Sequence, residues 1–249
     1  MAEQKNEIAE QPKQTFSEIM LAELESKKLG LPKGFNADRF VMNAMALLNE
    51  HPEYQKFGAN QLKVGLMKSA VLDIDIYLKQ GYFIPYGNQL QFQVSYTGQK
   101  KLVKKYAVRP VKDVSAELVR EGDVFEKQVT DDNTTFVFKP KPFNDGQIIG
   151  CFAYVQYADG GCQVEEMTKK EIDMVRSKSK AKGAMSWSDF YGEMAKKSAI
   201  RRLVKKIELS FENAEQYSLF EEDTAIDTTP KKAETHNPFD DDTNGLEEI

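Results

Sequence analysis

The sequence predicts an α+β fold in which N-terminal helices precede a β-hairpin, antiparallel strands packed with helices, and a flexible acidic C-terminal tail. Three observations predict it. Apolar residues recur at helical spacing near both ends of the expected core, residues 36–211. Residues 89–96 instead alternate between apolar and polar side chains, as a half-buried strand does. Between these regions, Gly, Asn and Asp turn signals recur at short intervals.

The N-terminal part of the chain predicts helices. Residues 1–35 form a polar, partly disordered segment that includes a helix over about 15–29. Asn36 and Asn60 suit the N-caps of two further helices, because apolar residues at helical spacing follow each of them.

A β-hairpin follows these helices. In QLQFQVSY, four apolar residues alternate with three glutamines and a serine, so one face is apolar and the other carries amides. The preceding GYFIPY supplies a partner strand, and Gly87-Asn88 supplies the turn. The amides of Gln91 and Gln93 can bond phosphates or base edges, although an ordinary hydrated sheet face is the default explanation.

A short basic helix comes next, in TGQKKLVKKY. It places Lys100, Lys101, Lys104 and Lys105 on one side and apolar residues on the other. The basic side must face solvent or a ligand. A solvated helix face is the ordinary explanation, and contact with nucleic acid is the alternative.

The middle of the chain predicts a meander of antiparallel strands over residues 107–166, with polar turns at REGD, DDNT, FNDG and ADGG. A helix follows over residues 168–176, where Thr168 and Glu171 have the spacing of a capping box. The segment SKSKAKGAMS lacks an apolar stripe and predicts a mobile loop.

A strong amphipathic helix extends from Trp187 to about Ile207. One side is apolar, and on the other Lys197, Arg201 and Lys205 recur every four residues. A tryptophan at such a position is more often a core anchor than a platform for base stacking.

Charge is distributed unevenly along the chain. Residues 212–249 hold twelve acidic residues and two lysines, a net charge of −10, so residues 1–211 carry +5 of the total of −5. Within the core, residues 97–112 hold six Lys or Arg and no acid, and residues 176–206 hold ten against two. Such clusters are typical of a protein that binds a polyanion, and the expected tail, residues 212–249, is acidic and disordered.

Several function classes lack their motifs. No G-x-x-x-x-G-K-[ST], G-x-G-x-x-G or G-x-S-x-G occurs, so the sequence gives no basis for nucleotide-driven or nucleophilic catalysis, and we expect neither an enzyme nor a cofactor. The sequence has only two histidines, which lie far apart in the chain, so we do not expect a histidine-based metal site or catalytic base. Asp73 and Asp75 are the one carboxylate pair that suggests a metal-dependent nuclease, and they lack a third ligand at a recognisable spacing.

The location of the protein follows from further absences. No window has the length of a membrane span, and the N-terminus lacks a signal peptide, so we expect a soluble cytoplasmic protein without membrane contact. In that reducing compartment, Cys151 and Cys162 are expected to be free thiols rather than a disulfide.

Two stretches resemble the RecT family of phage single-strand DNA annealing proteins. GYFIPYGNQLQFQVSYTGQKKLVKK resembles the family's GY-x-x-PY strand, Q-x-Q-x-x-Y-x-G strand and basic helix. WSDFYGEMAKKSAIRRLVKK resembles its W-x-x-[DY]-[FY]-x-x-MA-K-K-[ST]-x-x-[KR] helix. The resemblance covers roughly residues 36–210, and two long blocks in the family's order are more specific than either charge cluster.

The resemblance implies a RecT/Redβ-type annealing core in which the hairpin, a third strand and a helix form a DNA groove. Residues at positions matching the two blocks are then expected to contact DNA. They are Gln91, Gln93, Tyr96, Lys100, Lys101, Lys104, Trp187, Tyr191, Lys196, Lys197, Arg201 and Lys205.

The resemblance also implies an activity and partners. The chain would bind single-stranded DNA, pair complementary strands through an annealed duplex intermediate without ATP, and form homo-oligomeric rings or helical filaments. A phage exonuclease and a host single-strand-binding protein are implied partners, and the host is a bacterium carrying a phage or prophage. A passive single-strand coating protein and a nuclease that uses Asp73 and Asp75 are the other two possibilities.

Overall fold

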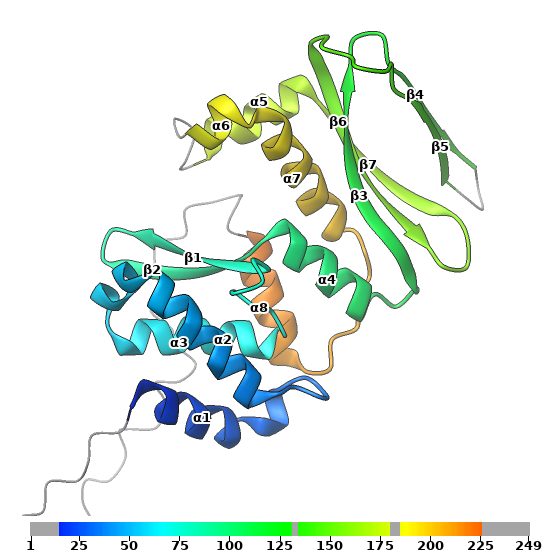
Figure 1. Ribbon diagram of the computed structural model, residues 1–249. Helices are drawn as coiled ribbons and strands as arrows, with labels where there is room; N and C mark the ends of the chain where they lie inside the picture. Colours follow the sequence, from blue (N-terminus) through cyan, green and yellow to red (C-terminus); the bar gives the residue numbers. More distant parts are fainter. Residues whose placement is uncertain (1–14, 131–133, 180–184, 226–249) are drawn as a thin grey trace, which may run out of the picture.

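The computed structural model describes residues 15–130, 134–179 and 185–225. The expected disorder at the N-terminus, the centre of the expected basic loop and the tail beyond residue 225 lie outside the described residues. Figure 1 shows the described chain as two lobes, one mainly helical and one mainly β, with helices between them. The α+β class predicted from the sequence is confirmed.

The helical lobe combines three helices with a two-stranded hairpin. Asn36 caps the second helix, as predicted, and its side chain accepts a hydrogen bond from Arg39 N. The third helix begins one residue before Asn60, which therefore lies in the first turn rather than at the cap. The elements are α1 (Phe16–Ser26), α2 (Ala37–Glu50), α3 (Ala59–Val71), β1 (Gly81–Tyr86) and β2 (Gln89–Val94), with 3-10 turns at Lys28–Gly30 and Pro52–Phe57.

The hairpin has the predicted turn and register. Tyr86 pairs with Gln89, so a two-residue turn joins the strands, and Gly87 takes a positive φ of 61° there. Leu90 and Val94 are buried on the apolar face of β2. The strand ends at Val94, before the serine and tyrosine that the sequence pattern includes.

The β lobe contains a three-stranded antiparallel sheet and a separate hairpin. The sheet order is β3-β6-β7, so β3 pairs with β6 and the hairpin β4-β5 is left out of the sheet. The simple meander predicted from the sequence is therefore wrong. The reason is aromatic packing, because Phe136 and Phe138 of the hairpin lie 5.4 and 5.1 Å from the Phe152 ring of β6. The strands are β3 (Val111–Arg120), β4 (Val124–Val129), β5 (Thr134–Lys139), β6 (Ile148–Tyr157) and β7 (Cys162–Thr168).

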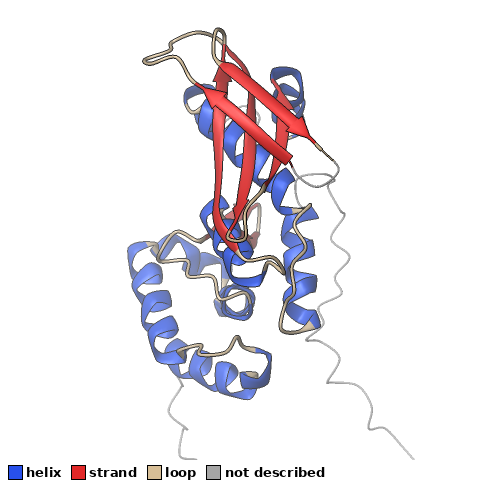
Figure 2. Ribbon diagram, turned by 90° about the vertical axis from the view of Figure 1, so that its right-hand side faces the viewer, coloured by secondary structure: helices blue, strands red, loops and turns tan. Residues whose placement is uncertain are grey.

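Strand β6 forms the centre of this lobe. Its side chains alternate, so Phe152 and Tyr154 face the β4-β5 hairpin while Cys151, Ala153 and Val155 face the helices. Figure 2 shows the strands of this lobe, β3 to β7, at one end of the molecule with helices beside them. The sheet is thus covered on one face by a hairpin and on the other by helices.

Five helices complete the described chain. A single helix from Trp187 to about Ile207 was expected, but the chain breaks at Phe190 and the second helix ends at Val204. Gly192 follows the break, and a Cβ there would lie 2.7 Å from Leu118, so the glycine permits close packing on β3. The helices are α4 (Tyr96–Tyr106), α5 (Lys169–Lys178), α6 (Met185–Asp189), α7 (Tyr191–Val204) and α8 (Ala214–Ala225).

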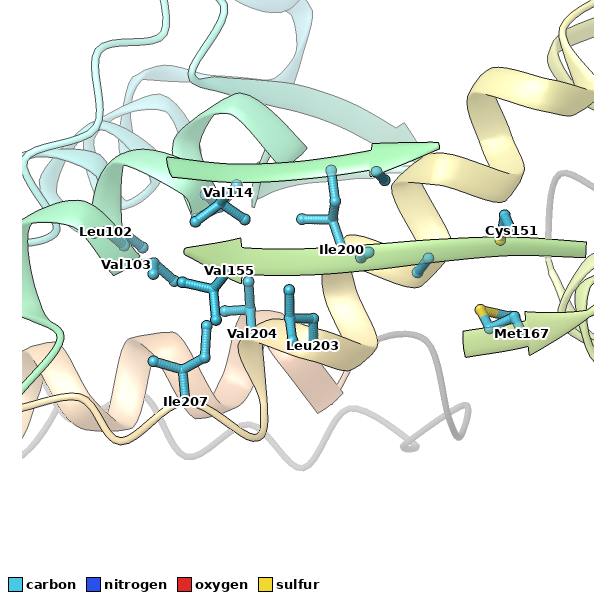
Figure 3. Close-up of a cluster of buried hydrophobic side chains, with 14 of the residues drawn as sticks. Leu102, Val103, Val114, Cys151, Val155, Met167, Ile200, Leu203, Val204 and Ile207 are labelled. Atoms are coloured by element: carbon cyan, nitrogen blue, oxygen red, sulfur yellow. The ribbon is translucent and has the colours of Figure 1, made fainter. Parts of the chain in front are cut away.

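The larger core joins α4, α7 and the sheet. Leu102 and Val103 from α4 pack with Leu203 and Val204 from α7, and all four side chains are fully buried. Figure 3 shows these residues between the sheet and the helices. A second core of α1, α2, α3 and the β1-β2 hairpin stabilises the helical lobe.

Helix α8 contradicts the predicted start of the disordered tail at residue 212. Phe220 enters the larger core, and Gln216 is completely buried, with its Nε2 donating to the Val71 carbonyl at 3.0 Å. Buried contacts therefore stabilise residues 214–225 even though the segment is acidic. The helix connects α3 of the helical lobe to the core of the β lobe.

Candidate nucleic-acid interface

The β1-β2 hairpin presents one face away from its core. Tyr82 pairs with Gln93 and Ile84 pairs with Gln91, so these four side chains share that face. Gln91 is half-buried, whereas Gln93 is buried and donates from Nε2 to the hydroxyl of Tyr86 at 3.2 Å. The predicted amide face exists, but at least one N–H of the Gln93 side chain is already hydrogen-bonded within the hairpin.

The hairpin leads directly into α4. Ser95 caps this helix, accepting from Gly98 N at 3.0 Å and donating to the Lys79 carbonyl at 2.9 Å. A Cβ on Gly98 would lie 2.1 Å from the Gln80 carbonyl oxygen, so only glycine allows α4 to start this close to β1. As a result Tyr96, 44% exposed, stands at the junction of hairpin and helix.

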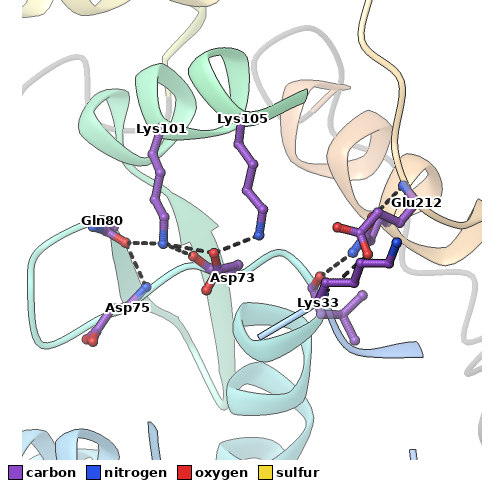
Figure 4. A network of polar contacts seen from close by, with 9 residues as sticks. Lys33, Asp73, Asp75, Gln80, Lys101, Lys105 and Glu212 are labelled. Atoms are coloured by element: carbon purple, nitrogen blue, oxygen red, sulfur yellow. Dashed lines mark hydrogen bonds and ion pairs between the residues drawn. The ribbon is translucent and has the colours of Figure 1, made fainter. Parts of the chain in front are cut away.

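The lysines of α4 form two rows rather than one basic side. Lys101 and Lys105 converge on Asp73, with Nζ to Oδ2 distances of 3.3 and 2.9 Å (Figure 4). Lys104 instead pairs with Asp113 of β3 at 3.1 Å. These ion pairs orient the side chains, and their partial exposure leaves them accessible to a phosphate.

Trp187 is a core residue in the structure. Its side chain is 1% exposed, so it does not offer a surface for base stacking in this conformation. Its ring meets Tyr191 edge to face at 6.0 Å. Burial, followed by a 2.7 Å hydrogen bond donated to Asp173, raises the pKa of Tyr191, which is half-buried. The aromatic pair of the second block therefore anchors α6 and α7.

The predicted cationic row on α7 is interrupted. Lys196 is half-buried and pairs with Glu193 at 2.6 Å, Lys197 is half-buried, and Lys205 is exposed. Arg201 is only 7% exposed, so its predicted place on a solvent-facing row is wrong. Helix α8 covers it, and an Arg201 guanidinium nitrogen lies 3.8 Å from Asp223 Oδ2.

Asp223 is the main residue that sequence reasoning missed. It also accepts a hydrogen bond from Val94 N of β2 at 2.8 Å and from Gln99 Nε2 of α4 at 3.4 Å. One carboxylate thus ties β2, α4 and α7 together. The signal available in the sequence was the spacing of Gln216, Phe220 and Asp223 on one side of a helix.

The structure brings the two basic blocks together. Helices α4 and α7 pack through their apolar sides, which directs Lys100 and Lys205 away from the shared core. The hairpin joins the same assembly through Asp223. Of the expected DNA-contact residues, Trp187, Arg201 and Gln93 are buried and the others are half-buried or exposed.

The carboxylate pair has structural partners. Asp73 is neutralised by the two α4 lysines, and Asp75 accepts from Asn43 Nδ2 at 2.6 Å and from Leu78 N at 3.2 Å. Within the described ranges, no group of three or more His, Cys, Asp or Glu is placed to hold a metal ion. The same part of the chain contains no helix long and apolar enough to span a membrane.

Comparison with known proteins identifies the family. The profile of the RecT family matches residues 38–236, which include both basic blocks and α8. The chain belongs to the RecT family. It is 29% identical to Protein RecT of Escherichia coli (strain K12) over 80% of this chain and 77% of that protein. It is 23% identical to YqaK, an uncharacterized protein of Bacillus subtilis (strain 168), over 82% of this chain and 70% of that protein.

RecT membership makes this chain a recombination-associated single-strand annealing protein. The hairpin, α4 and α7 all lie inside the residues that the family profile matches.

Proposed function

We propose that the chain binds single-stranded DNA along the hairpin, the outer side of α4 and the polar side of α7, and pairs complementary strands without ATP. The observation that supports this most is the packing of α4 on α7. Two basic segments about ninety residues apart in sequence share one apolar core and turn lysines outward. The residues proposed to contact DNA are Gln91, Tyr96, Lys100, Lys101, Lys104, Lys196, Lys197 and Lys205.

Annealing requires no covalent step from this chain. Each lysine that neutralises a phosphate releases condensed counterions, and this release favours binding to any sequence. Neutralisation also reduces repulsion between two complementary strands, whose base pairing and stacking then drive the reaction. We expect the ring of Tyr96, which is exposed between hairpin and helix, to stack on an unpaired base.

Three family residues that are buried or half-buried have a supporting role in this proposal. Trp187 and Tyr191 position α7, while Arg201 holds α8 through Asp223. Substituting them is therefore expected to reduce stability together with DNA binding.

Self-assembly and partners are also proposed from family membership. The chain would act as a homo-oligomeric ring or helical filament in the cytoplasm of a bacterium that carries a phage or prophage. It would receive single strands from a phage exonuclease and contact the host's single-strand-binding protein.

A nucleotide-free annealing assay tests the proposal. Complementary fluorescent oligonucleotides are mixed with wild type, with a Lys100→Ala, Lys205→Ala double variant and with Lys28→Ala. Lys28 pairs with Glu25 at 3.0 Å outside the proposed surface and is 71% exposed, so it is the matched control. We expect faster pairing with wild type and the control, and loss of the acceleration in the double variant.

Other results would identify other functions. If wild type coats single strands without accelerating their pairing, the chain is a passive coating protein. Cleavage of the strands in magnesium would support the nuclease based on Asp73 and Asp75. Equal annealing by wild type and the double variant would exclude the proposed surface.

A further inference from the structure

Phe143 has two unfavourable features at once. Its side chain is 100% exposed, and its backbone φ is +52°. A non-glycine residue in this left-handed region costs about 1 to 2 kcal/mol, and an exposed ring contributes no packing to the fold. Strained backbone of this kind indicates a function when the surrounding structure maintains it.

Hydrogen bonds hold the loop around Phe143 in one conformation. Asp123 Oδ1 accepts from Lys141 N at 2.9 Å and from Asn144 Nδ2 at 2.8 Å. Asn144 Oδ1 accepts in turn from Gly146 N at 2.9 Å. Hydrogen bonds from the backbone N–H of Lys141, and after it that of Arg120, lower the pKa of Asp123. The Asp123 carboxylate that holds the loop is therefore charged at neutral pH. The loop therefore presents Phe143 as a rigid apolar knob.

An open pocket of about 360 Å³ lies at the other end of the same strands. Its lining combines the aromatic residues Phe136 and Tyr157 and the half-exposed Cys162 with polar residues, among them Lys112, Thr135 and Gln156. Because a cavity of about 150 Å³ accommodates benzene, this pocket has room for a phenyl ring.

The knob and the pocket of one molecule cannot meet. The Phe143 loop joins the end of β5 to the start of β6, whereas the pocket lies at the start of β5 and the end of β6. Strand β6 has ten residues, so at about 3.3 Å per residue the two features are roughly 30 Å apart. A contact between them requires two molecules.

We propose that Phe143 of one copy inserts into the pocket of Phe136, Tyr157 and Cys162 on the next copy. The inference rests on the self-assembly included in the proposed function and specifies the surfaces that carry it. Because the two surfaces differ, the interface is heterologous, and repeating it produces a ring if the rotation closes or a filament if it does not.

Particle size without DNA provides the first test, by mass photometry and light scattering over a range of protein concentrations. We expect wild type to assemble, and Phe143→Ala and the pocket variant Thr135→Arg each to shift the distribution to monomers. Phe190→Ala is the matched control, because Phe190 is a 59% exposed phenylalanine at the break between α6 and α7, away from the β4-β5 hairpin and its loop. A monomeric wild type, or a Phe143→Ala variant that assembles like wild type, would overturn the proposal.

DNA binding by the monomeric variant separates this proposal from the proposed function. Phe143→Ala is expected to bind a short single-stranded oligonucleotide with the affinity of a wild-type subunit. Normal assembly with reduced oligonucleotide affinity would instead assign the knob to DNA and refute the intersubunit contact.

Cross-linking tests the geometry directly. In Pro142→Cys the knob is retained and a thiol stands beside it, while the native Cys162 provides the second thiol in the pocket. A short bismaleimide at neutral pH, where maleimides add to thiols rather than to lysine amines, should then produce a ladder of multimers that disappears in Pro142→Cys, Cys162→Ser. Dimers that persist in this double variant would show that two loops meet symmetrically, and the head-to-tail contact would be wrong. Cys151 is 2% exposed and does not interfere.

Discussion

Removing the Asp223 carboxylate should destabilise the protein far more than removing its acidic neighbour. The side chains of Arg201 and Asp223 are 9% and 7% exposed, and the carboxylate also accepts the Val94 N–H at 2.8 Å. Losing one partner of a buried ion pair costs about 3 to 5 kcal/mol, because the remaining charge stays desolvated. We expect Asp223→Ala to lower the free energy of unfolding by that amount.

Chemical denaturation followed by circular dichroism measures this loss. Glu222→Gln is the matched control, since Glu222 is 58% exposed and pairs with Lys68 at the surface, where an ion pair contributes about 0 to 1 kcal/mol. Replacing both charges, in Arg201→Met, Asp223→Leu, should recover part of the loss because no buried charge remains, while the Val94 N–H still lacks its acceptor. If Asp223→Ala lowers the free energy of unfolding no more than the control does, Asp223 of α8 does not form the buried ion pair with Arg201.

Four further predictions concern single residues. Phe143→Gly should have a free energy of unfolding about 1 kcal/mol higher than Phe143→Ala, since both variants lack the ring and only glycine adopts the positive φ without strain; a lower thermal midpoint for the glycine variant would contradict this. Lys205→Ala should reduce the slope of log affinity against log salt for single-stranded DNA by about 0.7, and an unchanged slope in binding titrations would exclude a phosphate contact. The hydrogen bond from the Thr168 backbone N–H, and after it the one from Arg202, lowers the pKa of Glu171 in the folded protein. The ionised Glu171 carboxylate therefore stabilises the fold fully above pH 4.5, its ordinary pKa, and this contribution is lost as the pH falls through the lowered pKa. Glu171→Gln should therefore lose less thermal stability than wild type below pH 4.5, and parallel melting curves would disprove it. Burial raises the pKa of Cys151 to about 12, so iodoacetamide at neutral pH should label Cys162 first by mass spectrometry; equal labelling would show that Cys151 is accessible.

Features that depend on neighbouring residues could be predicted from the sequence. The hairpin turn at Gly87, the cap at Asn36 and the Thr168–Glu171 capping box all form as expected, because their contacts span four residues or fewer. The apolar side of α4 was also predictable, since helical spacing alone defines it.

Features that depend on distant contacts could not be predicted in the same way. The four-residue spacing of Lys197, Arg201 and Lys205 predicts one exposed row, but Asp223, from a segment that looks disordered, covers the middle residue. The position of the β4-β5 hairpin against β6, outside the sheet, likewise involves a ring contact between Phe136 and Phe152. In both cases the deciding partner lies outside the local pattern.

Helix α8 also determines the order in which the molecule can be completed during synthesis. Gln216 bonds a carbonyl 145 residues earlier, and Asn213 bonds one 183 residues earlier. The ribosome must therefore release nearly the whole described chain before α8 can complete the contacts between the two lobes. Until then the Val94 N–H and the Arg201 guanidinium lack Asp223, the carboxylate that contacts both of them in the complete fold. A nascent chain that stalls before residue 212 would expose the part of the larger core that Phe220 of α8 covers. Such a chain would be a substrate for chaperones or would aggregate.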